Sequence, residues 1–373
     1  MKRLIERLQP LKTAVKSVFF ISIAVLVVVE LIRLKRTITL ESLESALSGL
    51  SIWHLALMVV IGLVAVLPML FYDLILNKEL ETDYSKSYIL ETSWAVNTIN
   101  NLSGFAGLVD VGLRYSFYSE DGHEKSGVKA LSRLLPYFMS GLSLLSGLVF
   151  ATFWFFPLSP DLRKYWLLLL GIFLYLPFIF FVSSREKLPY FGQVPLKTRL
   201  SLILVSTAEW GTALVSFLSV AYLMGLHVPL YNLIPLYFLA VIIGIFSMIP
   251  GGIGSFDLIV ISGLTSMGVS NALAVSLLLL FRLTYYIIPF LLGVVFFFKH
   301  MGGHINDKYF NIPSRVFGGS FHLILVYLLR FLGIFLILSA LIPESLANVY
   351  FISRFDPIPF SYTHLTLPTT SRV

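Results

Sequence analysis

The chain contains seven apolar runs, each long enough for one helix to cross a lipid bilayer. A transmembrane helix needs about 20 apolar residues, because the hydrocarbon core is about 30 Å thick and a helix rises about 1.5 Å per residue. Backbone polar groups find no water there, so only helices and closed barrels can span it. The pattern predicts an all-α polytopic membrane protein with seven spanning helices. They cover residues 15–34, 53–76, 131–156, 166–183, 200–223, 272–298 and 317–342.

Composition supports the same class. Hydrophobic residues make up 57% of the chain and charged residues only 13%, whereas soluble domains have about 25% charged residues. A soluble globular domain is therefore excluded. The chain has no cysteine, which excludes disulfides and thiolate metal sites. The net charge of +7 suits basic cytoplasmic loops and attraction to anionic lipids.

Two further apolar segments are interrupted by residues that end helices. Irregular backbone at membrane depth is stable only when it is buried in protein or lines a watery cavity. We therefore expect two re-entrant or discontinuous helices. Residues 88–113 are broken at Asn97, Asn100, Asn101, Ser103, Gly104 and Gly107, and residues 233–264 at Pro250, Gly251, Gly252 and Gly254.

The two broken segments share one spacing, G-x-x-G-x-x-D. It runs from Gly104 to Asp110 and from Gly251 to Asp257, and each segment follows a helix that carries an acidic residue, Asp73 or Glu209. Inverted repeats whose broken helices meet near the midplane are typical of transporters. We expect an inverted repeat in which the two segments approach each other.

Loop charges predict the orientation. Basic residues gather before residue 17, in residues 184–199 and after residue 298, and these parts are expected in the cytoplasm. Residues 225–232 hold no Lys or Arg and are expected outside. This places the N-terminus in the cytoplasm. It also places residues 33–44 outside despite their three basic residues.

Charged residues inside spanning segments cost at least about 2.5–3.5 kcal/mol each, so each needs a reason. Glu209 and Arg282 both lie about ten residues into their helices, counting along the printed sequence. They form either a buried pair that fixes packing or lining charges of a substrate path, to which Asp257, Asp73 and Arg114 would also belong. The alternatives are a helix N-cap for Asp257, an interfacial position for Asp73 and snorkelling to the surface for Arg114.

Soluble-enzyme chemistry finds little support. His300 and His304 are separated by two glycines, so a helical metal pair is not expected. The glycine motifs follow no strand, which argues against dinucleotide or P-loop sites, and the short basic loops give no support to nucleic-acid binding. No cofactor and no catalytic residue is assigned. Residues 361–373 (SYTHLTLPTTSRV) abandon membrane composition and are interpreted as a non-native tail.

Three motifs together resemble the family of the multiple peptide resistance factor, MprF. They are residues 247–257 (SMIPGGIGSFD), 281–290 (FRLTYYIIPF) and 97–107 (NTINNLSGFAG), where the family pattern has Gly in place of Ala106. The resemblance extends over residues 1–359. It implies a bacterial cytoplasmic-membrane flippase domain that moves lysyl-phosphatidylglycerol outward and so confers resistance to cationic antimicrobial peptides. The family's cytosolic synthase domain, which transfers lysine or alanine from aminoacyl-tRNA to phosphatidylglycerol, is not expected in this chain.

The resemblance also implies the partners. They are aminoacylated phosphatidylglycerol, anionic lipids, the synthase domain and, as a possibility, a second copy of the chain. A path for this headgroup needs acids for the amines and cations or helix N-termini for the phosphate. We expect Asp73, Glu209 and Asp257 in the first role, and Arg114 and Arg282 in the second. Two alternatives stay open: a scaffold that anchors a synthase, and a secondary transporter of a small soluble substrate.

Overall fold

The computed structural model describes residues 50–103, 108–118, 134–183, 194–247, 250–252 and 254–305. They belong to one compact unit, which extends to Ser320. The predicted spans at 15–34 and 317–342, the tail at 361–373, and the glycines Gly104 and Gly107 lie outside the described residues.

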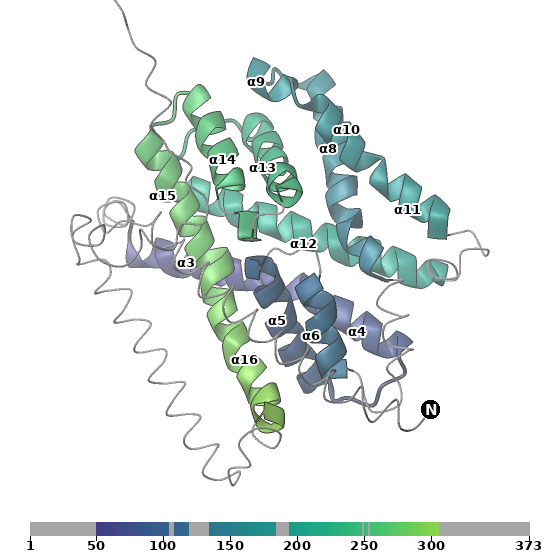
Figure 1. The fold of residues 1–373 in the computed structure, drawn as a ribbon. Coiled ribbons are helices and arrows are strands. Elements are labelled where there is room, and N and C mark those ends of the chain that lie inside the picture. Colours follow the sequence, from purple (N-terminus) through teal and green to yellow (C-terminus); the bar gives the residue numbers. More distant parts are fainter. Residues whose placement is uncertain are drawn as a thin grey trace, which may run out of the picture. The chain divides into compact units, whose positions relative to one another are not determined.

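Every element of the described part of the chain is helical, as the sequence predicts (Figure 1). The first half holds α3 Ile52–Val66, η1 Leu67–Met69, α4 Leu70–Glu79, α5 Lys86–Ser103, α6 Leu108–Tyr118, η2 Leu135–Met139, α8 Ser140–Phe155, α9 Pro160–Arg163, α10 Trp166–Phe173 and α11 Tyr175–Ser183. The second half holds α12 Leu196–Leu223, α13 Leu230–Phe246, η3 Pro250–Gly252, α14 Ser255–Ser266, α15 Asn271–Phe281, η4 Arg282–Ile287 and α16 Ile288–Ile305.

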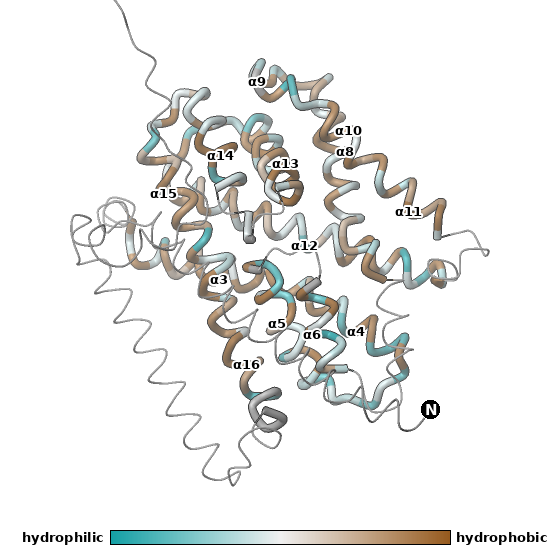
Figure 2. Tube along the Cα trace, in the orientation of Figure 1, coloured by the Kyte–Doolittle hydropathy of each residue, from teal (hydrophilic) through white to brown (hydrophobic). Residues whose placement is uncertain are grey.

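Five helical stretches among the described residues are long and apolar enough to cross a membrane. Each coincides with one predicted span, so the five predictions that fall on described residues are confirmed. Hydrophobic residues run along most of α10 and α11, while hydrophilic residues gather on α5 and α6 (Figure 2). The stretches are Ile52–Glu79, Leu135–Phe155, Trp166–Ser183, Leu196–Leu223 and Asn271–His300.

Large aromatic side chains stand exposed at helix ends. Trp53 opens α3, Trp154 lies at the end of α8, and Tyr222 at the end of α12, with exposed fractions of 79%, 69% and 81%. Such amphipathic rings are enriched at the level of the lipid headgroups. Their positions fit a protein whose outer surface faces lipid.

Both interrupted segments are broken into two helices, as predicted. The first forms α5 and α6 and the second forms α13, η3 and α14, and the two helices of each segment pack against each other. The second helices, α6 and α14, have 11 and 12 residues. At about 1.5 Å per residue they reach only about half the hydrocarbon thickness. Gly251 and Gly252 make the second break possible, because their φ angles are +60° and +62°.

Segments that the loop charges assign to the cytoplasmic side contact one another in the fold. Glu79 accepts from Thr198 at 2.9 Å, which joins the end of α4 to the start of α12. Lys299 near the end of α16 bonds Glu91 at 2.7 Å. Elsewhere, Asn232 accepts from the Ser159 backbone at 3.1 Å, which joins the first turn of α13 to the N-cap of α9. This grouping agrees with the predicted alternation; the cytoplasmic N-terminus stays a prediction.

Glycines let the helices that shape the centre approach closely. A Cβ on Gly62 of α3 would lie 2.2 Å from the Thr284 carbonyl oxygen in η4, and a Cβ on Gly141 of α8 would lie 2.1 Å from the Ser206 backbone in α12. Small residues at crossings are the usual means of close packing in membranes, where lipid offers no hydrophobic drive. These contacts hold α3, α12 and η4 around the site described next.

Candidate functional site

A cavity of about 440 Å³ lies among ten elements of the described chain. Both broken segments reach it: α5 and α6 supply one wall, and α13 with η3 supplies another. The spanning helix α12 and the π-helical turn η4 also line it. Its lining includes Tyr72, Asn97, Asn100, Asn101, Asp110, Glu209, Trp210, Tyr237, Gly251, Gly252, Phe256, Tyr285 and Tyr286.

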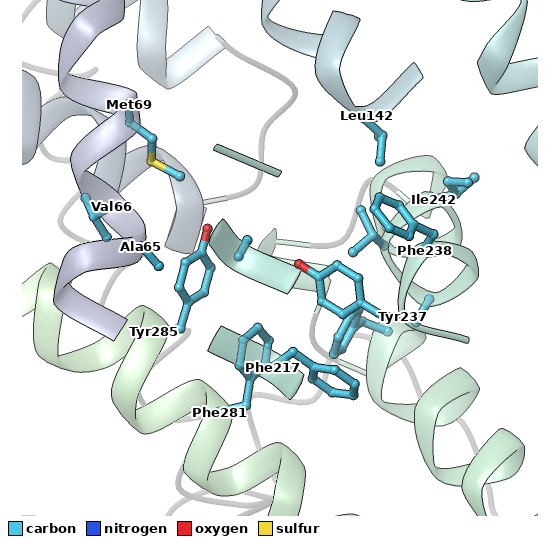
Figure 3. Packing of buried hydrophobic residues seen from close by; sticks show 14 of the residues in the cluster. Ala65, Val66, Met69, Leu142, Phe217, Tyr237, Phe238, Ile242, Phe281 and Tyr285 are labelled. Carbon is cyan, nitrogen blue, oxygen red and sulfur yellow. The ribbon is translucent and has the colours of Figure 1, made fainter. Parts of the chain in front are cut away.

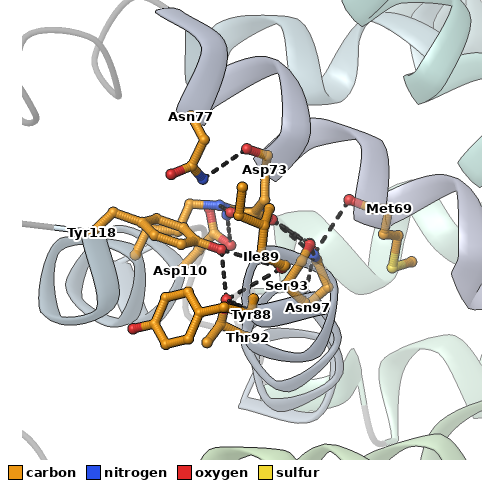
Figure 4. Close-up of polar contacts among 11 residues, drawn as sticks. Met69, Asp73, Asn77, Tyr88, Ile89, Thr92, Ser93, Asn97, Asp110 and Tyr118 are labelled. Atoms are coloured by element: carbon orange, nitrogen blue, oxygen red, sulfur yellow. Dashed lines mark hydrogen bonds and ion pairs between the residues drawn. The ribbon is translucent and has the colours of Figure 1, made fainter. Parts of the chain in front are cut away.

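A buried ionic network joins α4, α5 and α6 beside the cavity (Figure 4). Arg114 is fully buried and donates to Asp73 through Nε–Oδ1 at 2.8 Å and Nη2–Oδ2 at 2.9 Å. Its Nη1 also pairs with Asp110 one turn earlier on α6. One guanidinium therefore serves two buried carboxylates, from α4 and from α6.

Neutral side chains of α5 complete this network. Arg114 donates to the Asn97 Oδ1 at 3.1 Å, and the Asn97 amide donates to the Ser93 carbonyl oxygen at 2.8 Å. The Ser93 hydroxyl donates to Asp73. Because Asn97 also lines the cavity, the network and the cavity share a wall.

Glu209 lines the cavity and has no basic partner among the described residues. Its Oε2 accepts from the Tyr72 hydroxyl at 2.5 Å. Tyr72 itself stacks on Phe138 with ring centroids 4.1 Å apart. The alternative of a buried Glu209–Arg282 pair is therefore wrong, because Arg282 finds a different partner.

Arg282 pairs with Asp257 of the second broken segment. Its Nε and Nη2 donate to Oδ1 of Asp257 at 3.0 and 2.7 Å, and Nη2 also donates to Oδ2 at 2.9 Å. Asp257 in turn accepts from the Gly254 backbone at 2.8 Å, so it both caps α14 and pairs with the arginine. Arg282 opens η4, a π-helical turn; such turns are often found at functional sites.

Two buried oxygen atoms near the cavity have no hydrogen-bond partner in the described chain. They are Asn100 Oδ1 and Asp110 Oδ2. A buried acceptor without a partner costs about 1–3 kcal/mol, so it commonly marks a ligand position. Together with Glu209 of α12, they make the part of the cavity formed by α5, α6 and α12 rich in hydrogen-bond acceptors.

Buried aromatic side chains of α13 and η4 also line the cavity, and Figure 3 shows how they pack. Tyr237 of α13 and Tyr285 of η4 lie 2% and 5% exposed. Tyr285 stacks on Phe281 at 5.3 Å with an interplanar angle of 4°, and Tyr237 contacts Phe217 at 5.0 Å. The rings form a rigid face of the cavity.

The structure brings most of the sequence-predicted residues to this one place. Asn100, Asn101, Gly251, Gly252 and Glu209 line the cavity itself. This agrees with the expected approach of the two broken segments, since α5 also packs against η3.

The remaining predicted charges lie behind the lining. Asp73 and Arg114 are both 0% exposed in protein, so the interfacial position for Asp73 and snorkelling for Arg114 are wrong. Arg282 and Asp257 support η3 and η4 from behind, since Arg282 Nη1 reaches the Gly251 carbonyl oxygen at 3.5 Å. Gly254 lies at the start of α14; the side chain of Pro250 is not among those described.

Sequence reasoning missed Tyr72, Trp210 and Tyr237. Each lies in an apolar run, where an aromatic residue is most often a packing residue. The one available signal is the position of Tyr72 beside Asp73 and of Trp210 beside Glu209. Among the described residues, no three His, Cys, Asp or Glu side chains gather as a metal site would require.

Comparison with known proteins gives consistent results. The family model described as "Lysylphosphatidylglycerol synthase TM region" matches residues 18–293. A phosphatidylglycerol lysyltransferase of Bacillus subtilis (strain 168) is 29% identical over 298 residues, which cover 75% of this chain and 34% of that protein. One of Staphylococcus aureus (strain MRSA252) is 30% identical over 314 residues, 80% of this chain and 36% of that protein. The chain thus spans about a third of the length of these relatives.

Proposed function

The chain belongs to the family of lysylphosphatidylglycerol synthase transmembrane regions, and on this premise we propose that it moves lysyl-phosphatidylglycerol from the inner to the outer leaflet. The lysyl group carries two amines and the lipid one phosphate, so the headgroup has a net charge of about +1 near neutral pH. A protein that carries it through a bilayer must replace the water around these charges.

The charge balance around the cavity is the observation that carries the proposal. Asp73 and Asp110 share the single cation Arg114, Asp257 is paired with Arg282, and Glu209 is bonded only to a tyrosine hydroxyl. Four carboxyl groups thus face two guanidiniums in the described part of the chain, so two carboxyl groups have no cation of their own. Uncompensated charge in a membrane is expensive. The two amines of a lysyl group match the excess in number and sign.

The position of these carboxylates suits a headgroup. Glu209 and Asp110 both line the cavity, and the unpartnered Asn100 Oδ1 and Asp110 Oδ2 lie beside it. Ammonium groups donate several hydrogen bonds each and interact favourably with aromatic faces such as Trp210. The cavity volume of about 440 Å³ falls in the range of small-ligand pockets. The acyl chains can stay in lipid while the headgroup enters.

The cellular consequence follows from the lipid's charge. Lysyl-lipid in the outer leaflet lowers the negative surface charge, so cationic antimicrobial peptides are attracted less. The relatives are named phosphatidylglycerol lysyltransferase, and we propose that a synthase domain of this kind supplies the lipid and is a partner of this chain.

The experiment expresses the chain in a bacterium that lacks its own lysyl-lipid synthase, together with a separately encoded synthase domain. Total lysyl-phosphatidylglycerol is measured in lipid extracts, and the outer-leaflet share by labelling with a membrane-impermeant amine reagent. Unsubstituted chain should raise the labelled share. The double variant Glu209→Gln, Asp110→Asn should reduce it to the level of cells without the chain, at unchanged total lipid and unchanged membrane yield.

The matched control is Glu79→Gln, an exposed acidic residue at the end of α4. It should leave the labelled share unchanged. Labelling by the folded double variant at the unsubstituted level would refute the proposal. A chain that raises total lysyl-lipid without raising the labelled share would instead act as a scaffold for the synthase.

A further inference from the structure

Two buried tyrosines of the cavity leave their hydroxyl groups without a protein partner. Tyr237 and Tyr285 both line the cavity, and Figure 3 shows their hydroxyls extending from separate elements toward the same space. Neither hydroxyl bonds another residue in the part of the chain that the structure describes. Buried tyrosine hydroxyls usually find a partner in the protein. These two are instead free to donate to a ligand that enters the cavity.

Other tyrosines of the described chain show the usual behaviour. Tyr72 donates to Glu209, Tyr88 to the Phe117 carbonyl oxygen at 3.1 Å, and Tyr175 to the Pro136 carbonyl oxygen at 2.7 Å. Tyr137 and Tyr118 bond hydroxyls of neighbouring residues. Among the buried tyrosines of the described chain, only Tyr237 and Tyr285 lack such a bond. The partly exposed Tyr286 also lines the cavity without one.

The rings of the pair are held in place before any ligand arrives. Tyr285 stacks on Phe281, which also lies edge-on to Phe217, and Phe217 contacts Tyr237. The backbone at Tyr285 is pressed against Gly62 of α3. A ligand therefore orders little when it binds, and preorganised donors lose less affinity to entropy.

The distribution of donors and acceptors indicates which group the pair holds. Glu209, Asp110 and Asn100 Oδ1 offer acceptors from α12, α6 and α5, whereas the tyrosine hydroxyls offer donors from α13 and η4. Ammonium groups can bond only to acceptors, and a phosphodiester anion can bond only to donors. A headgroup with both groups is therefore favoured with its ammonium groups toward the carboxyl groups and its phosphate toward the tyrosines.

On this basis, we infer that Tyr237 and Tyr285 form a subsite for the phosphate of the lipid headgroup. The inference rests on the proposed function for the ammonium side. Arg282, the nearby cation, is already held by both oxygens of Asp257, so the phosphate meets neutral donors. Neutral donors bind an anion more weakly than a guanidinium does, which suits a group that must also leave.

The test measures binding to the purified chain in detergent micelles with three ligands: lysyl-phosphatidylglycerol, a lysyl-diacylglycerol ester that lacks phosphate, and inorganic phosphate. The variant is Tyr237→Phe, Tyr285→Phe, which keeps both rings. Its affinity for lysyl-phosphatidylglycerol should fall about ten- to a hundredfold, as expected for two lost bonds to an anion. Its affinity for the phosphate-free lipid should change by no more than about twofold, because the lost hydroxyls make no bond to that lipid.

The matched control is Tyr175→Phe, whose hydroxyl bonds Pro136 away from the cavity; it should change neither affinity. Each single Tyr→Phe variant should give a partial loss, which keeps the test valid if the double variant folds poorly. Unchanged binding of both lipids, or equal loss of both, would overturn the subsite. Binding of inorganic phosphate that the double variant loses, together with unchanged binding of both lipids, would indicate a subsite for free phosphate rather than for a lipid headgroup, and would overturn the inference. These outcomes concern binding alone, so they are separate from any failure of lipid exposure in cells.

Discussion

The guanidinium of Arg114 meets the carboxylate of Asp73 through two parallel hydrogen bonds of 2.8 and 2.9 Å, and neither side chain is exposed. The pair fastens α6 of the first broken segment to the spanning helix that contains α4. Arg282 and Asp257 do the same for the second broken segment, joining η4 to α14. Each re-entrant element is therefore held by one buried arginine.

Removal of Arg114 should destabilise the protein more than removal of Arg282. Arg114→Met strands two buried carboxylates and should lower the free energy of unfolding by about 3–5 kcal/mol, as for other broken buried pairs. Arg282→Met strands only Asp257, whose side chain is 17% exposed and still caps α14. Unfolding of both variants by denaturant in micelles checks the order; an equal or larger loss for Arg282→Met would contradict it.

Substitution of Gly62 should shift η4, which lines the cavity, although Gly62 itself does not line it. In Gly62→Ala the new Cβ would meet the Thr284 carbonyl oxygen at 2.2 Å, so α3 and η4 must move apart at a cost of about 1–3 kcal/mol. The control is Gly171→Ala, which meets no atom within 4 Å and should be neutral or slightly stabilising, since Ala favours helix more than Gly. Thermal unfolding of both variants measures the difference, and similar midpoints would argue against the close crossing.

The ion pair of Glu91 with Lys299 and His300 should matter little for stability. Lys299 Nζ and His300 Nε2 of α16 lie 2.7 and 2.5 Å from Oε2 of Glu91 in α5, but the Lys299 side chain is 57% exposed. Glu91→Gln should therefore cost at most about 1 kcal/mol, and the cost should shrink at high salt. Unfolding at low and high ionic strength provides the measurement. A loss as large as that of Arg114→Met would show that this end of α5 is more buried than the structure indicates.

Cross-linking should detect the meeting of the two broken segments. The chain has no cysteine, so a pair introduced as Asn101→Cys and Ile245→Cys is the only reactive pair. Both positions line the cavity, and a short bis-maleimide should join them in membranes. The control pair, Asn101→Cys with Leu258→Cys, uses a position on α14 that is 66% exposed and should react much less. Equal cross-linking of the two pairs would contradict the arrangement.

The sequence by itself determined the spanning helices and the positions of the breaks. Bilayer thickness translates directly into helix length, and Pro250, Gly251 and Gly252 cannot continue a helix. It also identified the deep charges, because each charge in an apolar run is costly and stands out. These inferences depend on residues near one another along the chain.

Only the tertiary structure decided which charge meets which. Arg282 pairs with Asp257, 25 residues away, and not with Glu209; Arg114 pairs with Asp73 across 41 residues. The partner of each charge depends on how the helices are rotated and how they cross. Close contacts such as that of Gly62 with η4 determine this arrangement. The role of Tyr237 was hidden for the same reason: in an apolar run a tyrosine looks like packing, and only the packed neighbours reveal that its hydroxyl is left facing a cavity.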